Sequence, residues 1–254
     1  MNNPQQQLAL YISSEQDCDY LPQQQSRNVF IAPDAEISPD IYEQLIYLGF
    51  RRSGQHIYRP HCKTCRSCIS TRIDVTNFNA SRSQKRILAK TKALTFSIYP
   101  ADFSEQHYQL YLRYQEHKHP GGSMQEFGRS EYRSFLCESL GNSVVFETRL
   151  NDKLLAVSVT DIFTHSISAV YTFFDPEFST LSLGTYSVLQ QIQYAKAHAK
   201  QHVYLGYYVK DSQKMSYKSN FRPLELLTEN QWKSFKKAEL LADISGSLDS
   251  ERSF

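Results

Sequence analysis

Four cysteines are spaced so that their thiols could meet at one point. Cys62, Cys65 and Cys68 form a CxxCxxC pattern, and Cys18 can supply a fourth sulfur. Neighbouring thiolates in this pattern can converge on one ion, and a remote fourth ligand completes tetrahedral zinc or an iron–sulfur cluster. The alternative is that three reduced cysteines pack as small apolar residues, because the second CxxC pair of an ordinary zinc ribbon is missing. The pattern predicts a structural metal site at Cys18, Cys62, Cys65 and Cys68.

Positive charge is concentrated in residues 44–101, which hold eleven Lys or Arg against one acid, although the whole chain has a formal net charge of only +2. Such segregation attracts a polyanion, and counterion release adds affinity at low salt. A solvated basic face without a partner is the alternative. Within this region, Ser81 and Gln84 predict a capping box that starts a basic helix. The cations predicted to bind nucleic-acid phosphates there are Arg82, Lys85, Arg86, Lys90 and Lys92.

A second basic stretch, LGYYVKDSQKMSYKSNFRPLE, covers residues 205–225. Its cations recur every four residues and alternate with aromatic rings, which suits an RNA end because rings stack on bases and ammonium groups meet phosphates. A solvated helix face is less favoured, since like charges at this spacing destabilise a helix. The residues of this stretch predicted to bind substrate are Tyr207, Tyr208, Lys214, Lys218 and Arg222.

The first hundred residues are predicted to form short strands and one helix, with a boundary near Pro100. A second helix begins at Ser104, where Phe103 and Tyr108 form a hydrophobic staple, and ends before His119-Pro120-Gly121-Gly122. A third helix is predicted over 131–140, ending at Gly141.

From residue 143 onward, the hydrophobic residues recur with the period that is typical of β-strands. Asn151-Asp152 predicts a hairpin between SVVFETRL and KLLAVSVTDIF, and SISAVYTFF gives a third strand. After Asp175-Pro176, a loop ending in Ser182-Leu183-Gly184 leads into an amphipathic helix and then the apolar strand HVYLGYYV. The predicted fold class is α+β.

The composition excludes several classes of protein. No run of 18 apolar residues occurs, and the start MNNPQQQLALYI lacks the basic and apolar regions of a secretory signal. We therefore expect a cytoplasmic protein without a membrane partner. The odd number of cysteines, five, suits reduced thiols or metal ligands better than a disulfide framework.

The run GFRRSGQHIYRPHCKTCRSCISTRIDVTNFNASRSQKR, residues 49–86, resembles the N-terminal signature of aminoacyl-tRNA–protein transferases. The similarity continues through YTFFDPEFSTLSLGTYSVLQQI and LGYYVKDSQKMSYKSNFRP, and it is strongest to the short bacterial form, the aspartate/glutamate leucyltransferases. This resemblance implies a smaller basic, Cys-containing N-terminal domain over 1–100 and a GNAT-like aminoacyltransferase domain over 101–254.

The resemblance also implies a reaction. The α-amine of an N-terminal Asp or Glu on an acceptor protein attacks the ester of leucyl-tRNA, and the modified protein becomes an N-degron substrate for degradation. Because the ester is already activated, positioning supplies much of the acceleration and no cofactor is required for the chemistry.

Several residues receive predicted roles in this reaction. Asp175 and Tyr171 are the predicted catalytic residues, although Asp175 could equally serve the Asp-Pro turn. Backbone groups at Ser182 and Gly184 would receive the 3′ end at a helix N-terminus. Phe173, with Tyr207 and Tyr208, would line an apolar pocket for leucine. Arg82, Lys214 or Arg222 could pair with the acidic side chain of the acceptor.

Three other functions compete with leucyl transfer. Arginyl transfer would use the same fold with a different donor, and a non-catalytic tRNA-binding adaptor would keep the basic surface and the cysteines without turnover. A coenzyme A acetyltransferase is disfavoured, because the loop LSLG lacks the fuller glycine pattern that binds pyrophosphate.

Overall fold

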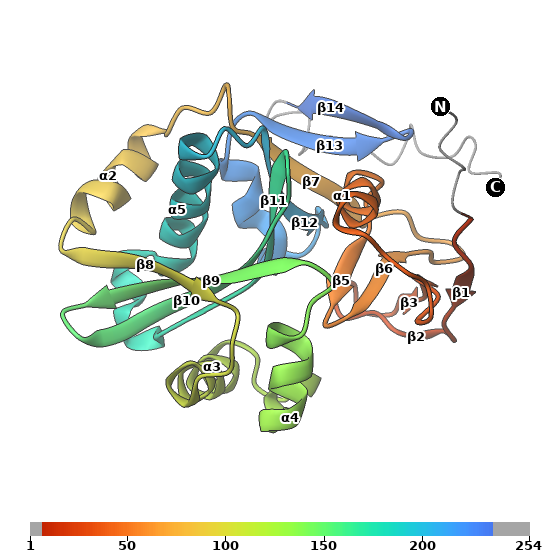
Figure 1. The fold of residues 1–254 in the computed structure, drawn as a ribbon, viewed down its shortest axis with the longest axis horizontal. Helices are drawn as coiled ribbons and strands as arrows, with labels where there is room; N and C mark the ends of the chain where they lie inside the picture. The colour runs from red at the N-terminus through yellow and green to blue at the C-terminus, as the bar shows by residue number, and fades with distance from the viewer. Residues whose placement is uncertain (1–6, 236–254) are drawn as a thin grey trace.

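The computed structural model describes residues 7–235 of the 254-residue chain. Its centre is an eight-stranded sheet in the order β14-β13-β7-β12-β11-β10-β9-β8 (Figure 1). In chain order these strands are β7 (Ile69–Asp74), β8 (Leu94–Pro100), β9 (Asn142–Leu150), β10 (Lys153–Ile162), β11 (Ser166–Phe174), β12 (His202–Tyr208), β13 (Leu224–Thr228) and β14 (Gln231–Phe235). Strands β11 and β12 pair in parallel, whereas the other neighbours pair in antiparallel fashion.

Helices cover both faces of this sheet (Figure 1). On one side, α5 (Leu183–Ala197) packs against β10, β11 and β12, and α2 (Arg82–Lys90) packs beside α5. The buried residues Val188, Leu189 and Ile192 of α5 join one hydrophobic core with Ile167 and Val203 of the sheet. On the other side, α3 (Glu105–Lys118) buries residues that include Leu110 and Tyr111 in a second core, and α4 (Arg129–Tyr132) lies nearby.

A second, four-stranded sheet lies beside the main sheet and has the order β1-β4-β6-β5 (Figure 1). Its strands are β1 (Leu10–Ile12), β4 (Asn28–Ile31), β5 (Arg51–Ser53) and β6 (His56–Pro60), accompanied by the helix α1 (Pro39–Tyr47) and the short pair β2 (Gln16–Asp17) and β3 (Gln25–Ser26). Tyr42 and Ile46 of α1 share a core with Tyr204 of β12 and with Phe163, which directly follows β10. The two sheets are therefore joined by apolar packing.

Short helical turns complete the chain. These are η1 (Ser123–Glu126), η2 (Arg133–Cys137), η3 (Pro176–Leu181) and η4 (Gln213–Asn220). Within residues 7–235, no helix combines the length and the apolar character that a membrane crossing requires.

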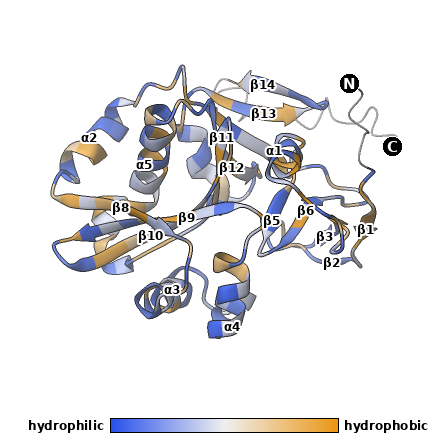
Figure 2. Ribbon diagram, in the orientation of Figure 1, coloured by the Kyte–Doolittle hydropathy of each residue, from blue (hydrophilic) through white to orange (hydrophobic). Residues whose placement is uncertain are grey.

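Most of the predicted elements are present. The α+β class is confirmed as a mixed helix-and-sheet fold. Ser81 and Gln84 form both bonds of the capping box, α3 ends at the cap residue His119, and β9 and β10 form the predicted hairpin. Figure 2 shows hydrophilic and hydrophobic residues mixed along α2, whose Ile87 and Leu88 pack against the core. The basic helix is therefore amphipathic.

The helix predicted over 131–140 is wrong in its extent. The chain forms α4 and then the π-helical turn η2, and at Glu138 the backbone is already extended. The carbonyls of Phe135 and Glu138 accept hydrogen bonds from the Arg52 guanidinium at 3.4 and 3.3 Å. The helix therefore ends where its backbone carbonyls bind Arg52, a residue that is distant in the sequence.

The main sheet crosses the predicted domain boundary at residue 100. Strand β7 of the N-terminal segment pairs with β12, and β8 pairs with β9. The division into domains 1–100 and 101–254 stays a prediction. Any relative motion of these two parts would have to preserve the β7–β12 and β8–β9 pairing.

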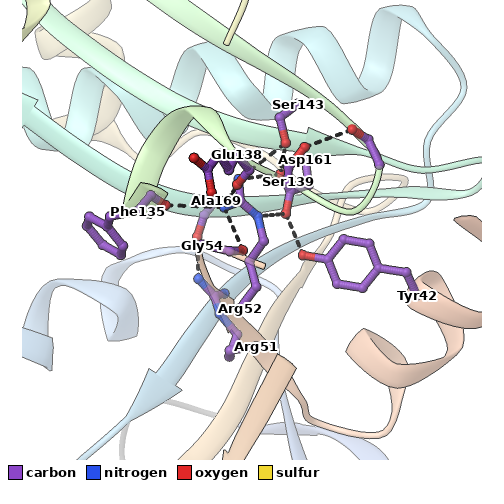
Figure 3. Close-up of polar contacts among 11 residues, drawn as sticks. Tyr42, Arg51, Arg52, Gly54, Phe135, Glu138, Ser139, Ser143, Asp161 and Ala169 are labelled. Carbon is purple, nitrogen blue, oxygen red and sulfur yellow. Dashed lines mark hydrogen bonds and ion pairs between the residues drawn. The ribbon is translucent and has the colours of Figure 1, made fainter. Parts of the chain in front are cut away.

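A buried ion pair ties the two sheets together (Figure 3). Arg52 of β5 donates from Nε to Asp161 Oδ2 at 2.8 Å and from Nη2 to Oδ1 at 2.9 Å. Tyr42 donates to Oδ2 at 2.7 Å, and Ser143 donates to Oδ1. Burial by itself would lower the pKa of Arg52, but the adjacent carboxylate of Asp161 raises it above its usual value. Each carboxylate oxygen of Asp161 therefore accepts two hydrogen bonds, one from Arg52 and one from a hydroxyl group.

Breaking this pair by removing one partner should strongly destabilise the fold. Removing one partner of a buried ion pair leaves an unpaired buried charge, so R52M should lower the free energy of unfolding by about 3–5 kcal/mol. The double change R52M/D161L should recover much of that loss, because it removes both charges together. Guanidinium unfolding, followed by the fluorescence of the single tryptophan, Trp232, would measure both effects.

The matched control is R129M, which breaks the exposed pair between Arg129 and Glu105. We expect its unfolding midpoint to match that of the wild type. An R52M protein as stable as R129M would contradict the anchoring role of the buried pair.

Candidate active site and RNA-facing surface

The parallel strands β11 and β12 stay paired over only a short length. Their register covers Ser166 with His202, Ile167 with Val203 and Ser168 with Tyr204. Beyond these pairs, the β11 segment 169–174 and the β12 segment 205–208 have no ladder between them. We call this region the β11–β12 wedge. Backbone groups that face it are available to side chains or ligands.

Arg51 fills part of the wedge. Its Nη2 donates to the carbonyl of Ala169, the first β11 residue beyond the paired region, at 2.6 Å (Figure 3). On the β12 side, Gly206 has a φ of +79°, and a Cβ there would lie 3.0 Å from the guanidinium carbon of Arg51. A side chain at residue 206 would therefore strain the backbone and crowd the guanidinium.

Lys218 is a second cation beside the wedge. Its side chain comes from η4, is buried, and donates from Nζ to the carbonyl of Tyr207. Burial lowers the pKa of Lys218 to about 7, the nearby Arg51 acts in the same direction, and Cys68 opposes it. The structure therefore places a buried amine, whose charged form is disfavoured, near the Arg51 guanidinium.

The four predicted metal ligands line one cavity of about 300 Å³. Cys18 comes from the segment between β2 and β3, whereas Cys62, Cys65 and Cys68 follow β6. Burial, with a smaller contribution from the neighbouring thiols, raises the pKa of Cys68 to about 12. Four sulfur donors are the ligand chemistry of zinc and iron–sulfur sites. As placed, no three His, Cys, Asp or Glu side chains within residues 7–235 already form an ion-holding group.

The predicted catalytic residues have structural partners. The carboxylate of Asp175 is buried, caps η3 by accepting from the backbone N–H of Glu177 at 3.0 Å, and lies 3.2 Å from Lys153 Nζ. These contacts match the turn role that was the alternative for Asp175. The hydroxyl of Tyr171 accepts from Gln115 at 2.7 Å, and burial raises its pKa. Neither group is placed as a free proton acceptor.

The aromatic residues predicted for a leucine pocket are not brought together. Phe173 is fully buried in the core under α3, and Tyr208 is buried in the core under α5. Tyr207 lines the cysteine cavity and donates to the carbonyl of Gly49 at 2.9 Å. Adjacent strand residues point to opposite faces, so Tyr207 and Tyr208 could not share a wall. A contact of Phe173 with leucine would require the core to open.

The basic helix α2 lies beside the segment that precedes α5. Arg82, Lys85, Arg86 and Lys92 are exposed, and Lys90 Nζ donates to the carbonyl of Thr180 at 2.8 Å. In that loop Ser182 adopts a φ of 53°, and Gly184 lies close to the ring of Phe174. The predicted phosphate-binding helix and the predicted 3′-end loop are therefore adjacent.

The other predicted cations are scattered. Lys214 is exposed on η4, and Arg222 donates to the carbonyl of Phe235 at 3.1 Å.

The residue that sequence reasoning missed is Arg51, which counted only as one of the eleven cations. Its signal was the pair Arg51-Arg52 on a strand, because alternation sends two neighbouring cations to opposite sides.

Comparison with known proteins identifies the relatives of this chain. The family models for "Arginine-tRNA-protein transferase, N terminus" and "Arginine-tRNA-protein transferase, C terminus" match residues 16–86 and 106–228. A protein named aspartate/glutamate leucyltransferase from Saccharophagus degradans is 45% identical over 230 residues, which cover 90% of this chain and 98% of the relative. One of the same name from Chromohalobacter salexigens is 41% identical over 237 residues, covering 91% and 96%.

Among solved structures, the crystal structure of FemX covers 82% of this chain and 81% of its own, with a TM-score of 0.44 and 9% identity, a likeness too weak to assign the fold. The sequence relationship is decisive by itself. The chain belongs to the tRNA–protein transferase family, among the bacterial members named aspartate/glutamate leucyltransferases.

Proposed function

We propose that this protein transfers leucine from leucyl-tRNA to the N-terminal Asp or Glu of acceptor proteins. The observation that carries the proposal is the 45% identity, over 98% of the relative's length, to a protein named for this activity. We further propose that the reaction takes place in the cytoplasm and marks the acceptor as an N-degron substrate for degradation.

The chemistry needs few groups from the enzyme. The acceptor's α-ammonium group loses a proton, and the free amine attacks the ester carbonyl to form a C–N bond. The nitrogen then gives up a second proton, the C–O bond to the 3′ adenosine breaks, and the 3′ oxygen takes up a proton and leaves as the tRNA hydroxyl. The enzyme holds amine and ester in line and offers hydrogen bonds to the developing oxyanion. No cofactor is required for these steps.

The domain that performs this chemistry is proposed to be of the GNAT type. Antiparallel strands β8 to β11 followed by α5 and the parallel strand β12 suit that assignment. The β11–β12 wedge is the proposed place of reaction, since its backbone groups lie outside the sheet ladders.

The donor tRNA is proposed to lie along α2. The exposed cations of this helix suit phosphates, and the bond from Lys90 to Thr180 connects the helix to the loop that holds Ser182 and Gly184. The 3′ end would then enter at the N-terminus of α5, where backbone N–H groups favour negative charge.

The cysteine cavity is proposed to hold a structural zinc ion or iron–sulfur cluster. Cys18, Cys62, Cys65 and Cys68 would supply four sulfur ligands from two segments. Such a group would cross-link the segment between β2 and β3 to the segment that precedes β7.

A second donor, arginyl-tRNA, is the competing proposal, because the matching family models carry arginine in their description. The test offers the purified protein radiolabelled leucyl-tRNA or arginyl-tRNA with peptides that begin in Asp, Glu, Lys or Ala. We expect label from leucyl-tRNA on the Asp and Glu peptides alone. Arginine on those peptides would change the donor, and tRNA binding without any transfer would favour an adaptor.

Charge reversal on α2 should weaken tRNA binding. We expect K85E/R86E to lower the affinity most at low salt and to reduce the slope of log K against log salt by about 1–2, since each lost phosphate contact removes roughly 0.7–0.9 from it. The control R113E/K118E reverses two exposed charges on α3, across the sheet. Equal affinities of both variants at low salt would remove α2 from the tRNA site.

Loss of thiols should release the metal. We expect purified wild-type protein to contain zinc or iron by elemental analysis and C62S/C65S to contain much less. The control C137S changes a thiol outside the cavity and should keep the wild-type metal content. Wild-type protein purified without air or chelators and still free of both metals would contradict the site.

A further inference from the structure

Among residues 7–235, no carboxylate pairs with two basic side chains beside the wedge, the half-buried Arg51 and the buried Lys218. Lys218 is 4% exposed, and Arg51 Nη1 is buried without a hydrogen-bond partner. Within residues 7–235, neither side chain forms an ion pair, although Arg52 and Arg72 are each paired with a carboxylate. Buried charges are normally paired, so a buried guanidinium nitrogen without a partner, near a buried amine, indicates a place for an anion.

Both cations are held in position by the backbone of the wedge. Arg51 bonds the carbonyl of Ala169 on β11, and Lys218 bonds the carbonyl of Tyr207 on β12. An ammonium group has three donors and a guanidinium has five, so these contacts leave donors on each cation for a ligand. Each strand of the wedge thus holds one of these side chains, Arg51 from β5 and Lys218 from η4, through a backbone carbonyl.

The surroundings suit a small anion rather than a polynucleotide. The exposed cations of α2 can follow a phosphate backbone, whereas Lys218 and the unpaired Arg51 nitrogen are buried. Tyr217 is 39% exposed and its ring centre lies 6.0 Å from Lys218 Nζ, so the solvent-facing neighbour of this amine is an aromatic ring. These surroundings favour a single carboxylate group over a nucleotide chain.

We propose that Arg51 and Lys218 form the specificity subsite for the side-chain carboxylate of the acceptor's N-terminal Asp or Glu. This inference rests on the transfer reaction proposed above. It replaces the predicted partners Arg82 and Lys214, which are exposed, and Arg222, which bonds Phe235 on β14. The carboxylate would restore charge balance in the wedge and hold the acceptor's α-amine beside it.

The test compares peptides that begin in Asp with peptides that begin in Asn, which differ in the charge of one side chain. We expect R51M and K218M each to lower the Asp-to-Asn ratio of kcat/KM at least roughly tenfold, with the loss falling mainly on KM for the Asp peptide. The affinity for leucyl-tRNA should stay within twofold. The control K196M removes an exposed lysine of α5 and should leave the ratio unchanged.

The outcomes separate the two proposals. No transfer by the wild-type protein to any acidic peptide would overturn the proposed reaction. Transfer by the wild type, with an undiminished Asp-to-Asn ratio in folded R51M and K218M, would overturn the subsite alone. A parallel loss on both peptides would also overturn it, because a purely structural role predicts that result.

Conservative variants cover the case in which the Met variants do not fold. R51K and K218R keep both charges but change the reach and shape of the donor group. We expect the Asp-to-Glu ratio of kcat/KM to shift at least roughly threefold in one of them, because the two carboxylates differ by one methylene in length. Wild-type Asp-to-Glu ratios in both folded variants would overturn the subsite.

Discussion

The arrangement of this molecule depends on the buried ion pair between Arg52 and Asp161. It joins β5, in the small sheet, to β10, in the middle of the large one, and its hydrogen bonds extend to Tyr42 and Ser143. Because successive residues of a strand point to opposite sides, fixing Arg52 also directs Arg51 toward the β11–β12 wedge. One structural constraint therefore places a neighbouring residue beside the proposed reaction centre.

The basic residues of the proposed site form two groups, one exposed on the surface and one largely buried. The α2 cations lie on the surface, where they can meet a long polyanion without losing all of their hydration, and Lys90 links that surface to the loop before α5. Arg51 and Lys218 are held near the unpaired strands, where desolvation makes an unmatched charge costly and a bound carboxylate favourable. Together, the two groups of cations suit a reaction between a tRNA ester and an acidic N-terminus.

Much of the fold could be predicted from local signals. The Ser81 capping box, the α3 boundaries and the hairpin at Asn151 follow from short-range chemistry, and all are present. The end of the helix after α4 could not be predicted, because carbonyls there bind Arg52 from a distant strand. The roles of the site residues were harder to predict than the fold. The four cysteines share one cavity, and Asp175 makes the turn contact that was its alternative role, but the burial of Phe173 depends on tertiary structure.

The most direct test of this account is a crystal structure of the protein with a peptide that begins in Asp and an adenosine carrying leucine through a stable amide. We predict density for the peptide's carboxylate between Arg51 and Lys218, with its α-amine facing the leucyl carbonyl in the β11–β12 wedge. A peptide bound elsewhere, with Arg51 and Lys218 left without an anion, would contradict the account.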